Sequence, residues 1–179
     1  MKALRAIGLK AAFRYGIFTL LYLVYRSLPV SQLRIPFLRL LGAKIGSNCV
    51  MHSVKFFNYY RTGFAGLTMG NDCFIGDESL LDLAAPLTLE DQVTLAERVL
   101  VLTHLNVGYA DHPLQQHFPS STDPVIIRKG SFLGAASVVL GGVEIGPRAF
   151  VAASALVNKS VSESQVVAGV PAKTIKTLS

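Results

Sequence analysis

Residues 125–173 read VIIRKGSFLGAASVVLGGVEIGPRAFVAASALVNKSVSESQVVAGVPAK, and this stretch decides the fold. Aliphatic residues recur in it at every sixth position: Ile127, Leu133, Val139, Ile145, Val151 and Val157. A period of six fits neither an α-helix nor a single strand, whose side chains alternate with a period of two. Compact residues stand four positions after each aliphatic residue: Ser131, Ser137, Val143, Ala149, Ala155 and Val161. We therefore expect a solenoid with three very short strands in each turn and an aliphatic interior.

The same six-residue pattern extends toward the N-terminus with two interruptions. It begins at Ile45, stops over residues 52–66, resumes at Met69, slips by two residues near residues 86–88, and stops again over residues 105–124. Residues 52–66 are expected to form an irregular first coil or a capping loop, because terminal repeats are usually atypical. The loop at residues 105–124 is expected to be functional, because long loops are uncommon in compact domains. Glycines at Gly134 and Gly146 are expected at bends that need a permissive backbone.

The hexads and the ending VAGVPAK at residues 167–173 resemble the hexapeptide-repeat acetyltransferases. The resemblance is greatest to the branch of galactoside, maltose and capsular or O-antigen polysaccharide O-acetyltransferases. It covers roughly residues 42–176 and implies an all-β fold, a left-handed parallel β-helix, preceded by an α-helical segment at residues 1–41 and followed by a tail at residues 177–179. It also implies a homotrimer that uses acetyl-CoA as its donor.

The N-terminal part of the chain carries an unusual charge. Residues 1–71 contain ten Lys or Arg and no Asp or Glu, whereas residues 72–179 contain seven basic and eleven acidic residues. The net charges are therefore +10 (10 − 0) and −4 (7 − 11), and this asymmetry predicts an anionic partner surface. A membrane is favoured over nucleic acid, because the basic residues alternate with apolar runs and no nucleic-acid motif is found.

Residues 1–41 are expected to form a helix to about Leu28, a break at Pro29 and a second short helix that ends at Gly42. The uncharged run from Tyr15 to Tyr25 has eleven residues, whereas a spanning helix needs about 20. We therefore expect the helix to lie in the membrane interface, which predicts a cytoplasmic protein held peripherally on the inner face of the cell membrane. Packing against the solenoid, a cleaved signal peptide and a true membrane span are the alternatives.

Transfer of an acetyl group to a hydroxyl requires a base, and histidine is suited to that role near neutral pH. The resemblance implies His104, which stands where the coil passes into the long loop, although related sugar transferases carry this histidine two positions later, at Asn106 here. His112 is an alternative, since it lies in a His-Pro-Leu run, and His117 is a third. Asp82 matches an asparagine that contacts the acceptor sugar in galactoside-type relatives. It could hold the acceptor hydroxyl, orient the histidine, or be a solvated turn residue.

The resemblance implies eight contacts with the coenzyme A donor: Phe132, Gly134, Ala135, Ala153, Asn158, Lys159, Lys173 and Lys176. By this match the backbone N–H of Ala135 would face the thioester carbonyl, and Lys173 and Lys176 would lie near the nucleotide phosphates. Lysine pairs with phosphate as a point charge, without the bidentate geometry of arginine. Cys49 and Cys73 are expected to be small core residues, and no metal site is expected.

The sequence therefore predicts an acetyl-CoA-dependent O-acetyltransferase that acts on a saccharide or lipid-linked saccharide. The acceptor hydroxyl is expected to attack the thioester directly with help from a histidine, because no nucleophile-elbow motif is found. The acceptor, the acyl chain length and the choice between hydroxyl and amine acceptors stay open. A non-catalytic β-helix scaffold and a membrane-surface binding protein are the alternative functions.

Overall fold

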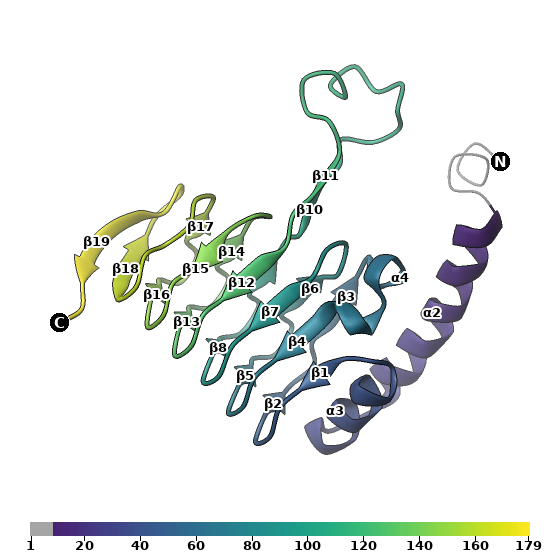
Figure 1. Cartoon of the computed structure of the whole chain (residues 1–179), viewed down its shortest axis with the longest axis horizontal. Coiled ribbons are helices and arrows are strands. Elements are labelled where there is room, and N and C mark those ends of the chain that lie inside the picture. Colours follow the sequence, from purple (N-terminus) through teal and green to yellow (C-terminus); the bar gives the residue numbers. More distant parts are fainter. Residues whose placement is uncertain (1–8) are drawn as a thin grey trace.

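The computed structural model describes residues 9–179, which form two helices followed by a long prism of short parallel strands (Figure 1). Helix α2 (Leu9–Ser27) and helix α3 (Ser31–Leu40) lie at one end of the prism, and the C-terminus lies at the other. The break between the two helices includes Pro29, as expected from the sequence. None of the helices in this described range is long and apolar enough to cross a membrane.

The prism has three faces, and each face is one sheet. The first face contains β1 (Lys44–Ile45), β4 (Leu67–Met69), β7 (Leu87–Leu89), β12 (Val125–Ile127) and β15 (Glu144–Ile145). The second face contains β2 (Val50–Met51), β5 (Phe74–Ile75), β8 (Thr94–Leu95), β13 (Phe132–Leu133), β16 (Phe150–Val151), β18 (Gln165–Ala168) and β19 (Lys173–Thr177). The third face contains β3 (Lys55–Phe57), β6 (Leu80–Asp82), β9 (Leu100–Val101), β14 (Val138–Val139) and β17 (Leu156–Val157). We call the bends after the first, second and third faces the first, second and third corners.

The six-residue period of the sequence is the length of one strand plus one corner. Ile127 pairs in register with Ile145, Leu133 with Val151, and Val139 with Val157, and all these side chains are buried. Each coil thus stacks its aliphatic residues directly on those of the coil before it, which removes them from water and supplies the main driving force for folding. The predicted parallel β-helix is confirmed.

The glycines after the aliphatic residues are required by close packing of the coils. A Cβ atom at Gly134 would lie 2.5 Å from the backbone nitrogen of Ala153 in the next coil. The positive φ of this corner falls two residues later, at Ala136, whose φ is 57°. The expectation that this glycine serves the bend's dihedral angles was therefore wrong, because the space between coils is what a side chain would fill.

The two ends of the prism are closed by different elements. Residues 52–66 form β3, α4 (Tyr59–Thr62) and a 3₁₀ turn, η1 (Phe64–Gly66), and their aromatic side chains pack against α2. At the other end, β19 pairs antiparallel with β18. Sequence reasoning did not anticipate this strand, which forms because the exposed edge of β18 offers backbone hydrogen bonds that a strand can take.

The long loop leaves and rejoins the prism at the third corner. Strands β10 (His104–Leu105) and β11 (Ser121–Thr122) form a short antiparallel pair at its base, and the residues between them project away from the solenoid (Figure 1). The backbone N–H of Asp123 donates to the carbonyl of Thr103 at 2.9 Å. The exit and re-entry points of the loop are therefore neighbours.

Candidate active site

The structure brings Asp82 and His104 into contact at the third corner. Asp82 is the last residue of β6, and His104 is the first residue of β10, which starts at this corner after β9. The Nδ1 atom of His104 forms a short hydrogen bond with Oδ2 of Asp82. The Asp82 side chain is completely buried, whereas 25% of the His104 side chain is exposed. A buried carboxylate therefore lies behind a histidine that reaches the surface.

The carboxylate of Asp82 is fully engaged by donors. Its Oδ1 atom accepts from Nδ2 of Asn58 at 2.8 Å and from the backbone N–H of Ala84 at 3.1 Å. Its Oδ2 atom accepts from the backbone N–H of Thr103 at 2.9 Å, in addition to His104. These donors compensate for the loss of water around a buried charge. The two extra residues that break the hexad phase near residue 86 enlarge this corner and bring Ala84 to the carboxylate.

The contact with Asp82 determines which nitrogen of His104 carries the proton. An ionised carboxylate can only accept hydrogen bonds, so Nδ1 of His104 must be the donor. In the neutral imidazole Nε2 then has a free lone pair. The ring of Phe57 lies edge-on to the imidazole, with centroids 6.0 Å apart, and packs beside it. This arrangement can take a proton from a hydroxyl at Nε2.

The other two histidine candidates lie in the projecting loop. His112 is exposed, and its Nδ1 atom accepts from the backbone N–H of Leu114 at 3.1 Å. His117 is also exposed and lies beside Gln116. Among the described residues, His104 is thus the histidine that the fold pairs with Asp82.

Four of the predicted donor contacts gather along the second face and second corner. Phe132 points outward from β13, and its ring stacks on that of Phe150 with centroids 4.8 Å apart. Gly134 and Ala135 form the next corner, and Ala153 lies at the same corner one coil further on. An open recess of about 570 Å³ runs along this corner and is lined in part by Ala135. Ala136 and four charged residues line the rest of it: Asp77, Glu78, Glu97 and Arg98.

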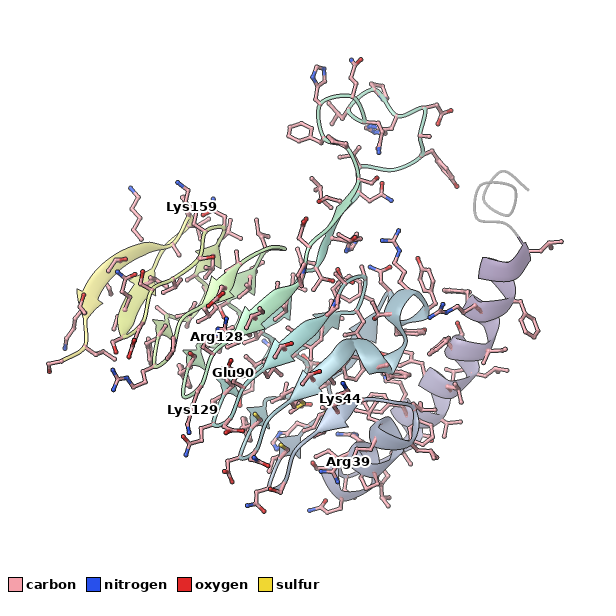
Figure 2. All side chains as sticks on the ribbon, viewed as in Figure 1. Arg39, Lys44, Glu90, Arg128, Lys129 and Lys159 are labelled. Atoms are coloured by element: carbon pink, nitrogen blue, oxygen red, sulfur yellow. The ribbon has the colours of Figure 1, made fainter. Side chains whose placement is uncertain are left out.

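The remaining predicted donor contacts lie elsewhere in the same chain. Asn158 and Lys159 are exposed after β17 at the third corner, where Lys159 projects from the edge of the prism (Figure 2). Lys173 and Lys176 are exposed on β19, at the C-terminal end of the second face. The prism therefore separates His104, at the third corner, from Phe132, on the second face of the same chain.

The cysteines do not form an evident nucleophilic centre. Cys73 is buried as expected, and burial raises the pKa of its thiol to about 11, so it is protonated at neutral pH. Cys49 is half-buried, less than expected, and its Sγ lies 3.1 Å from the carbonyl of Gly70. Across residues 9–179, no group of three or more His, Cys, Asp or Glu side chains is arranged to hold a metal ion.

A charged cluster on the first face serves to join coils. Arg128 donates from Nη1 to Glu90 at 2.7 Å and from Nε to Glu144 at 2.8 Å, and the three residues come from successive coils (Figure 2). The pKa of the Glu90 carboxyl is lowered, first by its hydrogen bond with Arg128. Arg128 lies where the chain rejoins the prism after the long loop, so the cluster fixes this re-entry point.

Sequence reasoning missed Asn58 and Thr103. Both lie at the third corner, but Asn58 belongs to the interrupted segment, where the six-residue phase is lost. The signal was present in the coil repeat, since Phe57 pairs in register with Asp82 and so places Asn58 at the same corner. Alignment of the coils before and after the interrupted segment would have placed Asn58 at the third corner.

Comparison with known proteins identifies the fold and the repeat. The family profile of the hexapeptide repeat of succinyl-transferase matches residues 124–159. A serine acetyltransferase of Buchnera aphidicola subsp. Acyrthosiphon pisum is 33% identical over 106 residues, which are 59% of this chain and 37% of that protein. The chain thus spans little more than a third of the length of this curated relative.

Solved structures match over almost the whole chain. A hexapeptide-repeat acetyltransferase from Vibrio cholerae matches with a TM-score of 0.81 at 22% identity. The match covers 96% of this chain and 94% of the Vibrio cholerae chain. A galactoside acetyltransferase in complex with coenzyme A matches with a TM-score of 0.80 at 19% identity. This match covers 97% of this chain and 84% of the galactoside acetyltransferase chain. The prism is therefore the left-handed β-helix on which these proteins are built.

Proposed function

We propose that this chain, which has the fold of the hexapeptide-repeat acetyltransferases, is an acetyl-CoA-dependent O-acetyltransferase. The observation that carries the proposal is the Asp82–His104 pair at the junction of coil and loop. The pair supplies an imidazole that a buried carboxylate holds through Nδ1, which leaves Nε2 for the acceptor. Such a group is suited to general base catalysis.

In the proposed reaction the acceptor hydroxyl attacks the thioester carbonyl directly. The hydroxyl proton passes to Nε2 of His104 as the new C–O bond forms, and the Nδ1–H bond to Asp82 stabilises the resulting imidazolium. The backbone N–H of Ala135 donates to the oxyanion of the tetrahedral intermediate. Collapse of the intermediate breaks the C–S bond, and the departing thiolate of coenzyme A takes up the proton from His104. The protonated state of Cys73 is in keeping with a route that has no acyl-cysteine.

The acceptor in this proposal is a saccharide or a lipid-linked saccharide. Its support is the structural match to a galactoside acetyltransferase and the resemblance of the hexads to polysaccharide O-acetyltransferases. The acceptor would enter beside His104, between the projecting loop and the segment at residues 52–66. These two segments depart from the repeat and could therefore set specificity.

The active form in this proposal is a homotrimer. Within one chain, His104 lies at the third corner, whereas Phe132 lies on the second face and Ala135 lies at the second corner. A thioester bound along the second corner would therefore meet a histidine contributed by another copy. A cyclic trimer would give three equivalent sites between neighbouring chains.

Helix α2 is proposed to rest on an anionic membrane surface on the cytoplasmic side. Its outward stripe consists of large apolar side chains at helical spacing, between 42% and 80% exposed: Leu9, Phe13, Ile17, Leu20 and Val24. Charge supports a membrane as the partner, since residues 1–71 contain ten basic residues and no acidic residue. Its opposite side packs on the first coil, so solenoid packing and membrane contact use different sides of one helix.

Calorimetric titration of acetyl-CoA into the purified protein tests the donor part of the proposal. We expect Lys173→Ala to weaken binding by about tenfold through the loss of a phosphate contact, and His104→Ala to bind as the wild type does. Lys44→Ala is the matched control, because Lys44 is an equally exposed lysine on the first face (Figure 2). Release of the coenzyme A thiol is then followed with a methyl galactoside as acceptor, and His104→Ala should lose it. A folded wild type that binds no acetyl-CoA would favour the non-catalytic scaffold.

A further inference from the structure

Asn58 contacts both members of the Asp82–His104 pair. Its Nδ2 atom donates to Oδ1 of Asp82 at 2.8 Å and lies 3.3 Å from Nδ1 of His104. Asn58 is half-buried and has a positive φ of 53°, a conformation that asparagine adopts more readily than most residues. We propose that Asn58 is a positioning residue that fixes the Asp82 carboxylate so that His104 keeps its proton on Nδ1. The inference rests on the proposed function of the pair.

The hydrogen bonds of Asp82 show why an amide is needed at this position. The carboxylate receives backbone donors from Ala84 on one oxygen and from Thr103 on the other. His104 adds a second donor to Oδ2, and Asn58 adds the second donor to Oδ1. Two donors on each oxygen hold the carboxylate plane in one rotamer. Removal of the amide leaves Oδ1 under-satisfied in a buried site, and the carboxylate can then rotate away from His104.

The position of Asn58 is set in turn by helix α2. Tyr59, the next residue, packs its ring on Tyr22 of α2 with centroids 4.7 Å apart. The hydroxyl of Tyr22 accepts from the backbone N–H of Phe56 at 3.2 Å, and Arg14 of α2 donates to the carbonyl of Arg61 at 2.9 Å. Helix α2 thus holds residues 56–61 on both sides of Asn58. The inner side of α2 supports the site while its outer side stays exposed.

Asn58→Gly is the cleanest deletion of this contact, because glycine adopts the positive φ without strain. We expect kcat for acetyl transfer to a methyl galactoside to fall about 10- to 100-fold, as misplacement of a catalytic group does. The KM for acetyl-CoA should stay within about twofold, since the donor corner is untouched. Asn58→Asp keeps the shape but replaces the donor with a second carboxylate, and kcat should fall at least as far. This variant decides the matter if the glycine variant does not fold.

Asn48→Gly is the matched control. Asn48 also has a positive φ, 56°, and its Nδ2 atom donates to Oδ1 of Asp72 at 3.2 Å on the exposed first corner. The substitution therefore removes the same kind of hydrogen bond from the same backbone conformation, one corner away from the pair. We expect kcat within about twofold of the wild type, because that bond is solvent-exposed.

The ¹⁵N shifts of the His104 ring in the free protein give a readout that needs no acceptor. We expect the wild type and Asn48→Gly to show the Nδ1–H tautomer, and Asn58→Gly to show a mixture of both tautomers. An unchanged tautomer together with unchanged kcat in Asn58→Gly would overturn the inference. If the wild type transfers no acetyl group but Asn58→Gly still alters the tautomer, the positioning role stands and the proposed function fails.

Discussion

The Asp82 side chain has no exposed surface, so the fold must supply every partner that water would otherwise provide. Four donors do so, and two of them are backbone N–H groups, from Ala84 in the bend with two extra residues and from Thr103 in the next coil. A solvated turn aspartate, one of the alternatives from the sequence, does not describe this site. The buried position agrees with a role in orienting the histidine.

The substitution Asp82→Asn should separate this role from simple packing. The amide would keep the size of the side chain, but one of its two terminal atoms would become a donor facing Asn58 or His104. We expect kcat to fall about 10²- to 10³-fold, within the range of general base catalysis. The control is Asp72→Asn, since Asp72 accepts from Asn48 on an exposed corner. Steady-state thiol release checks both, and equal losses would contradict the proposed role.

Cys73 predicts how stability changes with alkaline pH. Burial raises the pKa of its thiol from 9.0 to about 11, so the unfolded chain loses this proton first as pH rises. Its contribution to the free energy of unfolding is therefore constant below about pH 9 and falls between about pH 9 and 11. In urea unfolding between pH 8 and pH 10.5, the free energy of unfolding of Cys73→Ala should fall by about 2 kcal/mol less than that of the wild type. Cys49→Ala, the control, should follow the wild type.

At the scale of single residues, the sequence named Asp82 and His104 as candidates but did not show their contact. The phase tells which side chains face inward, and strand ends and corners follow from it. It carries no information where the repeat is interrupted, and Asn58 lies in such a segment. Which donors reach a carboxylate depends on corner shape, and this was visible only in three dimensions.

Among the elements, α2 combines two apolar sides. Tyr25 is buried at the first coil and donates from its hydroxyl to the carbonyl of Val54 at 3.0 Å, whereas Leu20 is 66% exposed on the opposite side. The sequence offered membrane contact and solenoid packing as alternatives. The structure shows the packing, and the exposed stripe keeps membrane contact as a proposal. A helix with two apolar sides cannot be assigned to one partner from periodicity alone.

Vesicle binding tests the outer stripe of α2. We expect the protein to bind vesicles that contain phosphatidylglycerol, more weakly at high salt because the attraction to anionic lipid is screened. The double variant Phe13→Glu/Leu20→Glu should bind about 100-fold more weakly, because two large apolar side chains no longer leave water. Sedimentation with vesicles measures the loss.

The control for this experiment is Val170→Glu/Ile175→Glu, which changes two similarly exposed apolar residues at the other end of the prism. It should bind as the wild type does. Equal weakening by the two double variants, or no binding by the wild type, would contradict membrane contact through α2.

At the scale of the whole molecule, the separation of His104 from Phe132 predicts complementation between chains. His104→Ala lacks the base, and Ala153→Trp places a bulky side chain on the second corner where the donor is proposed to lie, so each should be inactive alone. Co-expressed chains should recover about one quarter of wild-type activity, because random assembly makes about three quarters of the trimers mixed and each mixed cyclic trimer has one intact site in three. Thiol release by the purified mixture measures this. Activity that stays at the level of either variant alone would show that one chain contains the whole site.

The fold as a whole was predictable because one pattern repeats in almost every coil. Each hexad specifies one strand and one corner, and the stacking of similar aliphatic interiors then gives the prism. The closing strand β19 was missed because its partner is an edge, and edge pairing depends on backbone groups that the side-chain pattern does not describe. The segment around α4 was expected to be irregular because the six-residue pattern is interrupted there. It takes up a defined structure because α2 packs over it.

The way the long loop is attached has a consequence for evolution. The chain leaves at Thr103 and returns at Asp123, and one backbone hydrogen bond joins these points. Residues 106–120, which lie between β10 and β11, can therefore lengthen, shorten or be replaced while His104, the stacked coils and the Arg128 cluster stay in register. The solenoid of such a chain stays constant, whereas the loop beside its histidine is free to vary in length and sequence. If the proposed function is right, a new acceptor needs only a change in residues 106–120 and no new core.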